Sequence, residues 1–145
     1  MDFFNSIQTS SSGLSAQRLR MNLISGNLAN VNTTRTRDGG PYRRKEAIFA
    51  AQPMNSEFNK ILTDRLNNQT AGVRVDRIYE DTSPPLMKYD PSHPHANDKG
   101  YVAVPNINPM EEMVNMISAT RGFEANVTAL KAAKEMALKA LEIGR

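Results

Sequence analysis

The sequence predicts a mainly α-helical chain in which two long terminal helices pair as an antiparallel coiled coil, with a small β-rich insert between them. Three observations lead to this prediction. Apolar residues recur in alternating steps of three and four near both ends of the 145-residue chain. Prolines concentrate between those ends, where short alternating runs replace the helical pattern. Aromatic residues make up 6% of the chain and tryptophan is absent, which favours an elongated packing over a thick globular core.

The first helix is expected to run from Asp2 to about Thr34, within an N-terminal segment of residues 1–36. Its heptad stripe contains six apolar residues: Ile7, Leu14, Met21, Ile24, Leu28 and Val31. The polar exceptions, Ser10 and Gln17, lie in a Ser-rich half with lower helix propensity. The Gly39–Gly40–Pro41 sequence that follows ends the helical pattern.

Residues 37–105 are expected to form the middle β and loop insert, which includes seven of the eight prolines. Short alternating runs predict strands within residues 73–79 and 101–104. Residues 52–66 fit either a short helix or a mobile loop, and the sequence does not decide between them.

The second long helix is expected to begin at Pro109, within a C-terminal segment of residues 106–145 that completes one elongated subunit. Asn108 is placed as its N-cap, Pro109 as the first-turn proline and Glu111 as the carboxylate of a capping box. Its heptad stripe contains seven apolar residues: Met113, Met116, Phe123, Val127, Leu130, Ala137 and Leu141. Val114, Ile117 and Leu138 widen this stripe.

Pairing of the two stripes would cover one face of each helix, but the C-terminal stripe is wider than a two-helix seam requires. We therefore expect further neighbours. The residues expected to form the assembly interface share this apolar, heptad-spaced character: Ile7, Leu14, Met21, Ile24, Leu28, Val31, Met113, Met116, Ile117, Phe123, Val127, Leu130 and Leu141. Gly13, Gly26 and Gly122 either let another backbone approach closely or are merely tolerated within the helices.

The sequence offers no catalytic, cofactor or metal site, so an enzyme is not expected. There is no cysteine, and His93 and His95 are the only histidines, too few for a structural metal site with four side-chain ligands. No Gly-rich phosphate loop or nucleophile elbow is present. No apolar run approaches the roughly 20 residues of a membrane span, and a cleavable secretory signal is not recognisable.

One basic stretch, Arg35–Lys45, has a net charge of +4. It is either a solvated loop or a contact surface. The alternative function that it leaves open is a soluble coiled-coil adaptor or regulator that touches nucleic acid through this loop.

Residues 12–34 resemble the N-terminal signature of bacterial flagellar rod and hook axial proteins, whose centre is Asn-Leu-Ala-Asn-x-Asn-Thr. The matching residues are Asn27, Leu28, Ala29, Asn30, Asn32 and Thr33. Residues 82–94, 100–108 and 111–127 are similar to the short proximal-rod type within that family, so the resemblance covers essentially the whole chain. In one departure, residues 95–99 contain a single acid, Asp98, where the family usually has an acidic turn.

The resemblance implies a structural subunit of the flagellar basal-body proximal rod, located in the periplasm. Such subunits assemble helically into a hollow axial drive shaft that transmits torque and through which flagellar proteins are exported. The implied partners are further copies of the chain, other rod proteins, the adapter protein between the rod and the MS ring, and the flagellar type III export apparatus. Nucleic acid, a small-molecule substrate, a cofactor and insertion into a membrane are not implied.

Overall fold

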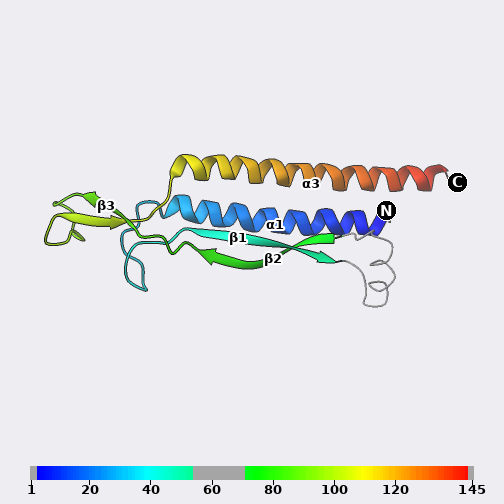
Figure 1. Cartoon of the computed structure of the whole chain (residues 1–145). Coiled ribbons are helices and arrows are strands. Elements are labelled where there is room, and N and C mark those ends of the chain that lie inside the picture. The colour runs from blue at the N-terminus through cyan, green and yellow to red at the C-terminus, as the bar shows by residue number, and fades with distance from the viewer. Residues whose placement is uncertain (1–2, 54–70, 144–145) are drawn as a thin grey trace.

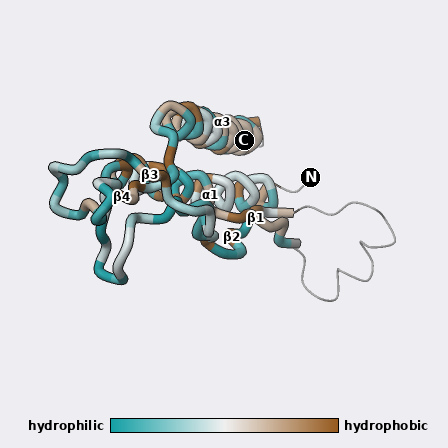
Figure 2. The backbone as a smooth tube through the Cα atoms, turned by 60° about the vertical axis from the view of Figure 1, so that its left-hand side comes forward, coloured by the Kyte–Doolittle hydropathy of each residue, from teal (hydrophilic) through white to brown (hydrophobic). Residues whose placement is uncertain are grey.

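The computed structural model describes residues 3–53 and 71–143 and has three layers that run along one another (Figure 1). Helix α1 (Phe3–Ala29) lies between helix α3 (Pro109–Ile143) and a two-stranded sheet, an order that a second view also shows (Figure 2). The start of α1 and the end of α3 lie at the same end of the molecule, so the two helices are antiparallel. The predicted mainly α fold with paired terminal helices and a small β insert is confirmed.

Helix α1 ends at Ala29, five residues before the predicted boundary, because polar side chains close its last turn. The side-chain Nδ2 of Asn30 donates to the carbonyl oxygen of Gly26 at 2.9 Å, and the Thr33 hydroxyl donates to Asn30 Oδ1 at 3.1 Å. These bonds hold the side chain of Asn30 against the last turn of the helix and tie Thr33 to it. The chain therefore turns at residues 30–32 instead of continuing the helix.

The Ser-rich half of α1 is helical despite its low propensity. The hydroxyl of Ser12 donates to the carbonyl oxygen of Thr9 at 2.7 Å, and Ser15 donates to Ser11 at 3.1 Å. The Ser12 oxygen also accepts the Val73 backbone N–H at 3.0 Å, which ties α1 to the neighbouring sheet. Tertiary contacts thus override the local preference against helix in this segment.

The sheet beside α1 pairs strand β1 (Lys45–Pro53) with strand β2 (Ala71–Glu80) in antiparallel register, with Lys45 opposite Glu80. Strand β2 includes the strand predicted at residues 73–79. Strand β1 was not predicted, because its central residues, Ala47–Ala51, are apolar without a period of two. Of the ambiguous range 52–66, residues 54–66 lie outside the described part of the chain.

A second, separate sheet pairs β3 (Leu86–Tyr89) with β4 (Tyr101–Val104), and it lies beyond the helix pair at the end where α3 begins (Figure 1). Strand β4 confirms the strand predicted at residues 101–104. The rings of Tyr89 and Tyr101 pack edge to face with centroids 5.3 Å apart. Gly100, which precedes β4, has a φ of +77°, a left-handed conformation that favours glycine.

Gly100→Ala is expected to destabilise the β3–β4 sheet by more than about 1–2 kcal/mol, the usual cost of a left-handed alanine alone. A Cβ at position 100 would lie 2.9 Å from Tyr89 Cε2, so steric overlap adds to the backbone cost. Urea unfolding of the two variants Gly100→Ala and Gly39→Ala measures both contributions. Gly39 has a φ of +87°, and a Cβ added there would meet no atom within 4 Å, so its variant reports the backbone cost alone. Equal losses in the two variants would contradict the proposed overlap.

Helix α3 begins as predicted. The Asn108 side-chain oxygen accepts the Met110 backbone N–H at 3.1 Å, which is an N-cap bond, and Pro109 is the first helical residue. Glu111 is exposed in this first turn, whereas Glu112 points into the structure and is buried.

The seam between α1 and α3 combines small residues with larger ones. Ala119 and Ala133 on α3 are buried, and the Thr120 hydroxyl lies 3.6 Å from Met21 Sδ on α1. A Cβ at Gly13 would lie 3.0 Å from the Asn126 side chain, and one at Gly122 would lie 3.3 Å from Gln17 Cδ. Gly13 and Gly122 thus make room for a side chain of the facing helix, whereas the expectation was the approach of another backbone. Gly26 has only the Tyr42 hydroxyl nearby, at 3.8 Å.

The orientation of α3 differs from the one that its apolar stripe predicts. The buried residues are Glu112, Ala119 and Ala133, none of which belongs to the predicted stripe. Met113 and Leu141, expected at the helix seam, are exposed instead. The physical reason is that small side chains allow close contact between the helices, while Glu112 has specific partners inside, which are described next.

Candidate functional site

A buried polar cluster joins the end of α1, the start of β1 and the first turn of α3. We call it the joint and define it as Asn27, Tyr42, Arg44, Lys45 and Glu112. Asn27 is 0% exposed and Glu112 is 1% exposed. Residues of these types are rarely buried unless they are paired, so their bonding decides whether the cluster stabilises the fold.

The Asn27 side chain uses all four of its hydrogen-bonding positions. Its Nδ2 donates to the carbonyl oxygen of Lys45 and to Glu112 Oε2, both at 2.9 Å. Its Oδ1 accepts the Lys45 backbone N–H at 2.9 Å and the Tyr42 hydroxyl at 3.2 Å. The two bonds to Lys45 resemble those between paired strands, so Asn27 fastens α1 to the first residue of β1.

The buried carboxylate of Glu112 is paired with a cation. Arg44 Nε donates to Glu112 Oε1 at 2.8 Å, and another Arg44 nitrogen donates to Glu46 Oε2 at 2.9 Å. Burial lowers the pKa of Arg44, but its bonds to Glu112 and Glu46 raise the pKa by more, so the net shift is upward. Burial is also the main cause that raises the pKa of Tyr42. No buried side-chain nitrogen or oxygen of the joint lacks a hydrogen-bond partner, so the joint is a structural network.

The residues of the Asn-Leu-Ala-Asn-x-Asn-Thr signature take part in this architecture to different degrees. Asn27 is the centre of the joint, and Asn30 and Thr33 close the end of α1. The carbonyl oxygen of Thr33 also accepts the Tyr42 backbone N–H at 3.0 Å. Of the remaining three residues, Leu28 is half-buried and its carbonyl oxygen accepts the Val31 backbone N–H at 3.4 Å, and Ala29 and Asn32 are exposed. Asn27, Asn30 and Thr33 thus determine the path of the chain as it leaves α1.

The thirteen residues expected at the assembly interface divide into three groups by exposure. Ile24 is buried. Nine are half-buried: Ile7, Leu14, Met21, Leu28, Val31, Met116, Phe123, Val127 and Leu130. Three are exposed: Met113, Ile117 and Leu141. Only the exposed group is fully available to another molecule.

The first two turns of α3 present an exposed apolar surface, which we call the α3 patch: Met110, Met113, Val114 and Ile117. The last three residues follow Met110 by three, four and seven positions, which places all four on one side of the helix. Val114 is 65% exposed and Ile117 is 54% exposed. One heptad further on, the same side carries Arg121 and Glu124, so the apolar surface is confined to one end of α3. A clustered exposed apolar surface of this kind is typical of an interaction site.

A second apolar surface lies at the opposite end of the helix pair. There the seam opens into a groove of about 740 Å³, lined by Phe3, Ser6, Ala133, Met136, Ala137, Ala140 and Leu141. Phe3 is the first described residue of α1, and α3 continues to Ile143. The elongated subunit therefore has an apolar surface near each end.

The basic stretch from Arg35 to Lys45 is partly engaged within the chain. Arg44 pairs with Glu46 and Glu112, and Lys45 Nζ pairs with Glu80 at 3.0 Å. Arg35, Arg37 and Arg43 are exposed. The basic surface offered to another molecule is thus smaller than the sequence suggests.

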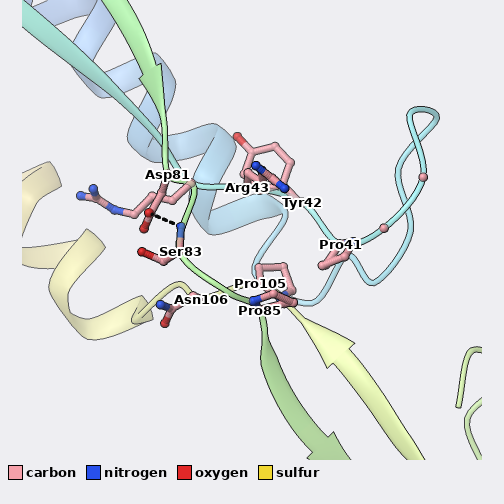
Figure 3. A pocket seen from close by; sticks show the side chains of 11 residues that line it. Pro41, Tyr42, Arg43, Asp81, Ser83, Pro85, Pro105 and Asn106 are labelled. Carbon is pink, nitrogen blue, oxygen red and sulfur yellow. Dashed lines mark hydrogen bonds between the residues drawn. The ribbon is translucent and has the colours of Figure 1, made fainter. Parts of the chain in front are cut away.

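A pocket of about 120 Å³ lies where three connecting segments meet, and Pro41, Pro85 and Pro105 each come from a different one (Figure 3). The Ser83 backbone N–H donates to Asp81 Oδ1 at 2.8 Å across one side of it (Figure 3). Hydrogen bonding from Ser83 lowers the pKa of Asp81, which makes this carboxylate a weaker base. The residues that line the pocket include no paired nucleophile and base.

The two histidines lie on the surface-exposed β3–β4 connection. Their rings pack with centroids 5.3 Å apart, and His95 Nδ1 is hydrogen-bonded to the Thr34 hydroxyl at 2.9 Å. Within residues 3–53 and 71–143, acidic and histidine side chains form no group of three or more that could hold a metal ion. None of the helices in the same ranges has the length and apolar character that crossing a membrane requires.

The sequence did not single out Glu112, Arg44 or Tyr42 as site residues. A usable signal was present at Glu112. Residues 112, 116, 119, 123, 126, 130 and 133 also follow steps of three and four, and they include Ala119, Asn126 and Ala133. A helix seam that contains alanine and asparagine is missed when its positions are identified by large apolar side chains alone.

Comparison with known proteins gives a consistent picture. Residues 7–35 match the family described as "Flagella basal body rod protein", and residues 98–143 match "Flagellar basal body rod FlgEFG protein C-terminal". The chain is 50% identical to flagellar basal-body rod protein FlgC of Borreliella burgdorferi, over 99% of this chain and 98% of that protein. It is 45% identical to FlgC of Bacillus subtilis and 34% identical to FlgC of Salmonella typhimurium, in both cases over the full length of both chains.

Proposed function

The chain belongs to the family of flagellar basal-body rod proteins, and on this basis we propose how its surfaces serve the rod. The full-length matches make it a structural, non-enzymatic subunit of the flagellar basal-body rod, of the FlgC type. Membership of this family implies assembly with other rod subunits.

In the proposal, the subunit belongs to the proximal rod in the periplasm and packs helically around a hollow axis that transmits torque and lets exported proteins pass. Residues 1–36 and 106–145 form the shaft, and residues 37–105 lie on its outside. A head-to-tail contact that does not close on itself generates a helical filament instead of a ring. Apolar surfaces near both ends of one elongated subunit suit such a contact.

The observation that carries this proposal is the α3 patch. A rod subunit must bury apolar surface against its neighbours, and the α3 patch remains exposed after α1 and α3 have paired. The other proposed interface residues lie between Ile7 and Val31, on α1 and the turn that follows it, and between Met116 and Leu141 on α3. They support the helix pair and the open groove at its other end.

The proposed neighbours are further copies of the chain, other rod proteins, the adapter protein that joins the rod to the MS ring, and the flagellar type III export apparatus during export. The exposed Arg35, Arg37 and Arg43 suit an acidic surface on one of them. Contact with nucleic acid is not part of the proposal.

Mass spectrometry of detergent-washed, sheared hook–basal bodies tests the location. Peptides of this chain are expected in amounts comparable to those of other rod proteins. A matched preparation from a strain without the gene provides the background. Recovery of the chain only in the cytosol, from cells with intact basal bodies, would contradict the proposal.

A further inference from the structure

In its first two turns, helix α3 has two sides that could face α1, and the structure uses the less apolar one. The seam side carries Glu112, Ala119 and Ala133, which are buried, whereas Met113 is 42% exposed and Ile117 is exposed as well. Burial of large apolar side chains is the main favourable contribution to helix packing. Further along the helix, Met116, Phe123 and Leu130 are half-buried on the seam side, so an interaction other than apolar burial is needed only for the first two turns.

Glu112 supplies that interaction. A carboxylate is costly to bury unless it is paired and hydrogen-bonded. Its two oxygens accept from Asn27 Nδ2 at 2.9 Å and from Arg44 Nε at 2.8 Å. Both partners belong to other parts of the chain, α1 and the residue that precedes β1, so the position of the carboxylate is fixed from outside α3.

Among the described residues, Glu112 is the only charged residue that is buried. Elsewhere in the seam, Gly13 lies against Asn126 and Gly122 against Gln17, and Ala119 and Ala133 are buried. Alanine and glycine interlock less than leucine or isoleucine. Successive residues of a helix lie about 100° apart, so rotation of α3 by less than one residue would bring Met113 toward α1. Helix pairs accommodate larger side chains by a modest increase in the distance between their axes.

We propose that Glu112, held by Asn27 and Arg44, is the positioning residue that sets the rotation of α3 about its own axis and thereby keeps the α3 patch outside. A single buried polar residue that selects one packing arrangement over another is well known in coiled coils. The consequence for rod assembly rests on the proposed function, but the rotation itself is a property of the isolated chain.

The chain contains no cysteine, so introduced thiols report on the orientation of α3 without background. One reporter is the labelling rate, with a maleimide, of the thiol introduced by Met113→Cys. The other is disulfide formation in the double variant Gln17→Cys and Gly122→Cys, because a Cβ at 122 would lie 3.6 Å from Gln17 Cγ. Both are measured on the purified full chain, with far-ultraviolet circular dichroism as the test of folding.

With Glu112 present, rapid labelling at 113 and formation of the 17–122 disulfide are expected. Glu112→Ala is expected to slow labelling at 113 at least about tenfold and to reduce the disulfide, with the helical signal retained. The matched control is Glu111→Ala. It removes the same charge from the same first turn at an exposed position and is expected to leave both readouts within about twofold of the parent.

A folded Glu112→Ala variant with the labelling and disulfide pattern of the parent would overturn the inference. If this variant loses its helical signal, Glu112→Gln takes its place. Glutamine keeps an acceptor for Asn27 but loses the charge that pairs with Arg44, so a smaller shift in the same direction is expected. An unchanged labelling rate at 113 in Glu112→Gln would then overturn the inference.

Discussion

Replacing Asn27 by leucine is expected to lower the free energy of unfolding by about 3–5 kcal/mol. Leucine is close to asparagine in size but cannot form any of the four hydrogen bonds that Asn27 makes. The substitution leaves the backbone groups of Lys45 without their partner and takes from Glu112 its bond to α1. Unpartnered polar groups in a buried position account for most of the expected loss.

Urea unfolding followed by circular dichroism measures this loss in the purified chain. Asn22→Leu is the matched control, because Asn22 is exposed on the same helix. Its effect is expected to stay within about 0.5 kcal/mol, as is usual for surface positions. A loss below about 1 kcal/mol for Asn27→Leu would mean that the joint contributes little to stability.

Ile117→Asp is expected to reduce incorporation of the subunit into hook–basal bodies at least about tenfold, since an apolar contact would have to bury an unpaired carboxylate. The stability of the chain itself is expected to change by less than about 1 kcal/mol, because Ile117 is exposed and aspartate differs little from isoleucine in helix propensity. Swimming in soft agar and mass spectrometry of isolated hook–basal bodies, in a strain without the native gene, measure the effect on assembly.

Thr128→Asp is the matched control for this experiment. Thr128 is exposed and lies two heptads beyond Val114 on the same side of α3, outside the α3 patch. The Thr128→Asp variant gains the same negative charge as Ile117→Asp and is expected to assemble like the unsubstituted protein. If Ile117→Asp is incorporated as well as Thr128→Asp, the α3 patch is not an assembly surface.

Local patterns in the sequence predicted the two helices and two of the strands. Heptad spacing located α1 and α3, and the Asn108–Pro109 pair marked the start of α3. These features depend on residues within one or two turns of each other. The predicted end of α1 lies five residues beyond the observed one. The apolar pattern continues to Val31, but the side-chain bonds of Asn30 and Thr33 end the helix earlier.

The orientation of α3 depends on contacts between distant residues and could not be predicted in the same way. Glu112 is hydrogen-bonded to Asn27, which is 85 positions away in the sequence, and to Arg44, which is 68 positions away. A glutamate beside Glu111 in the first turn of a helix suits an exposed position that favours the helix dipole, so its immediate neighbours do not indicate that it is buried. The available signal, the series in steps of three and four from Glu112 to Ala133, includes small and polar residues and is hidden by the larger apolar side chains beside it.

The signature residues illustrate the same division. The resemblance to rod and hook proteins identified Asn27, Asn30 and Thr33 as characteristic of the family, but it gave no physical role to any of them. The structure supplies one. Asn27 fastens α1 to β1 and α3, and the other two close the end of the helix.

The central claim is that the α3 patch contacts a neighbouring rod subunit, and site-specific photo-crosslinking tests it most directly. A photoreactive residue is placed at position 117 or, as the control, at position 128, and assembled hook–basal bodies are irradiated and analysed by mass spectrometry. Crosslinks from position 117 to another rod-protein chain, well in excess of those from position 128, are the predicted result. Normal incorporation of both variants with no crosslink from position 117 would contradict the account.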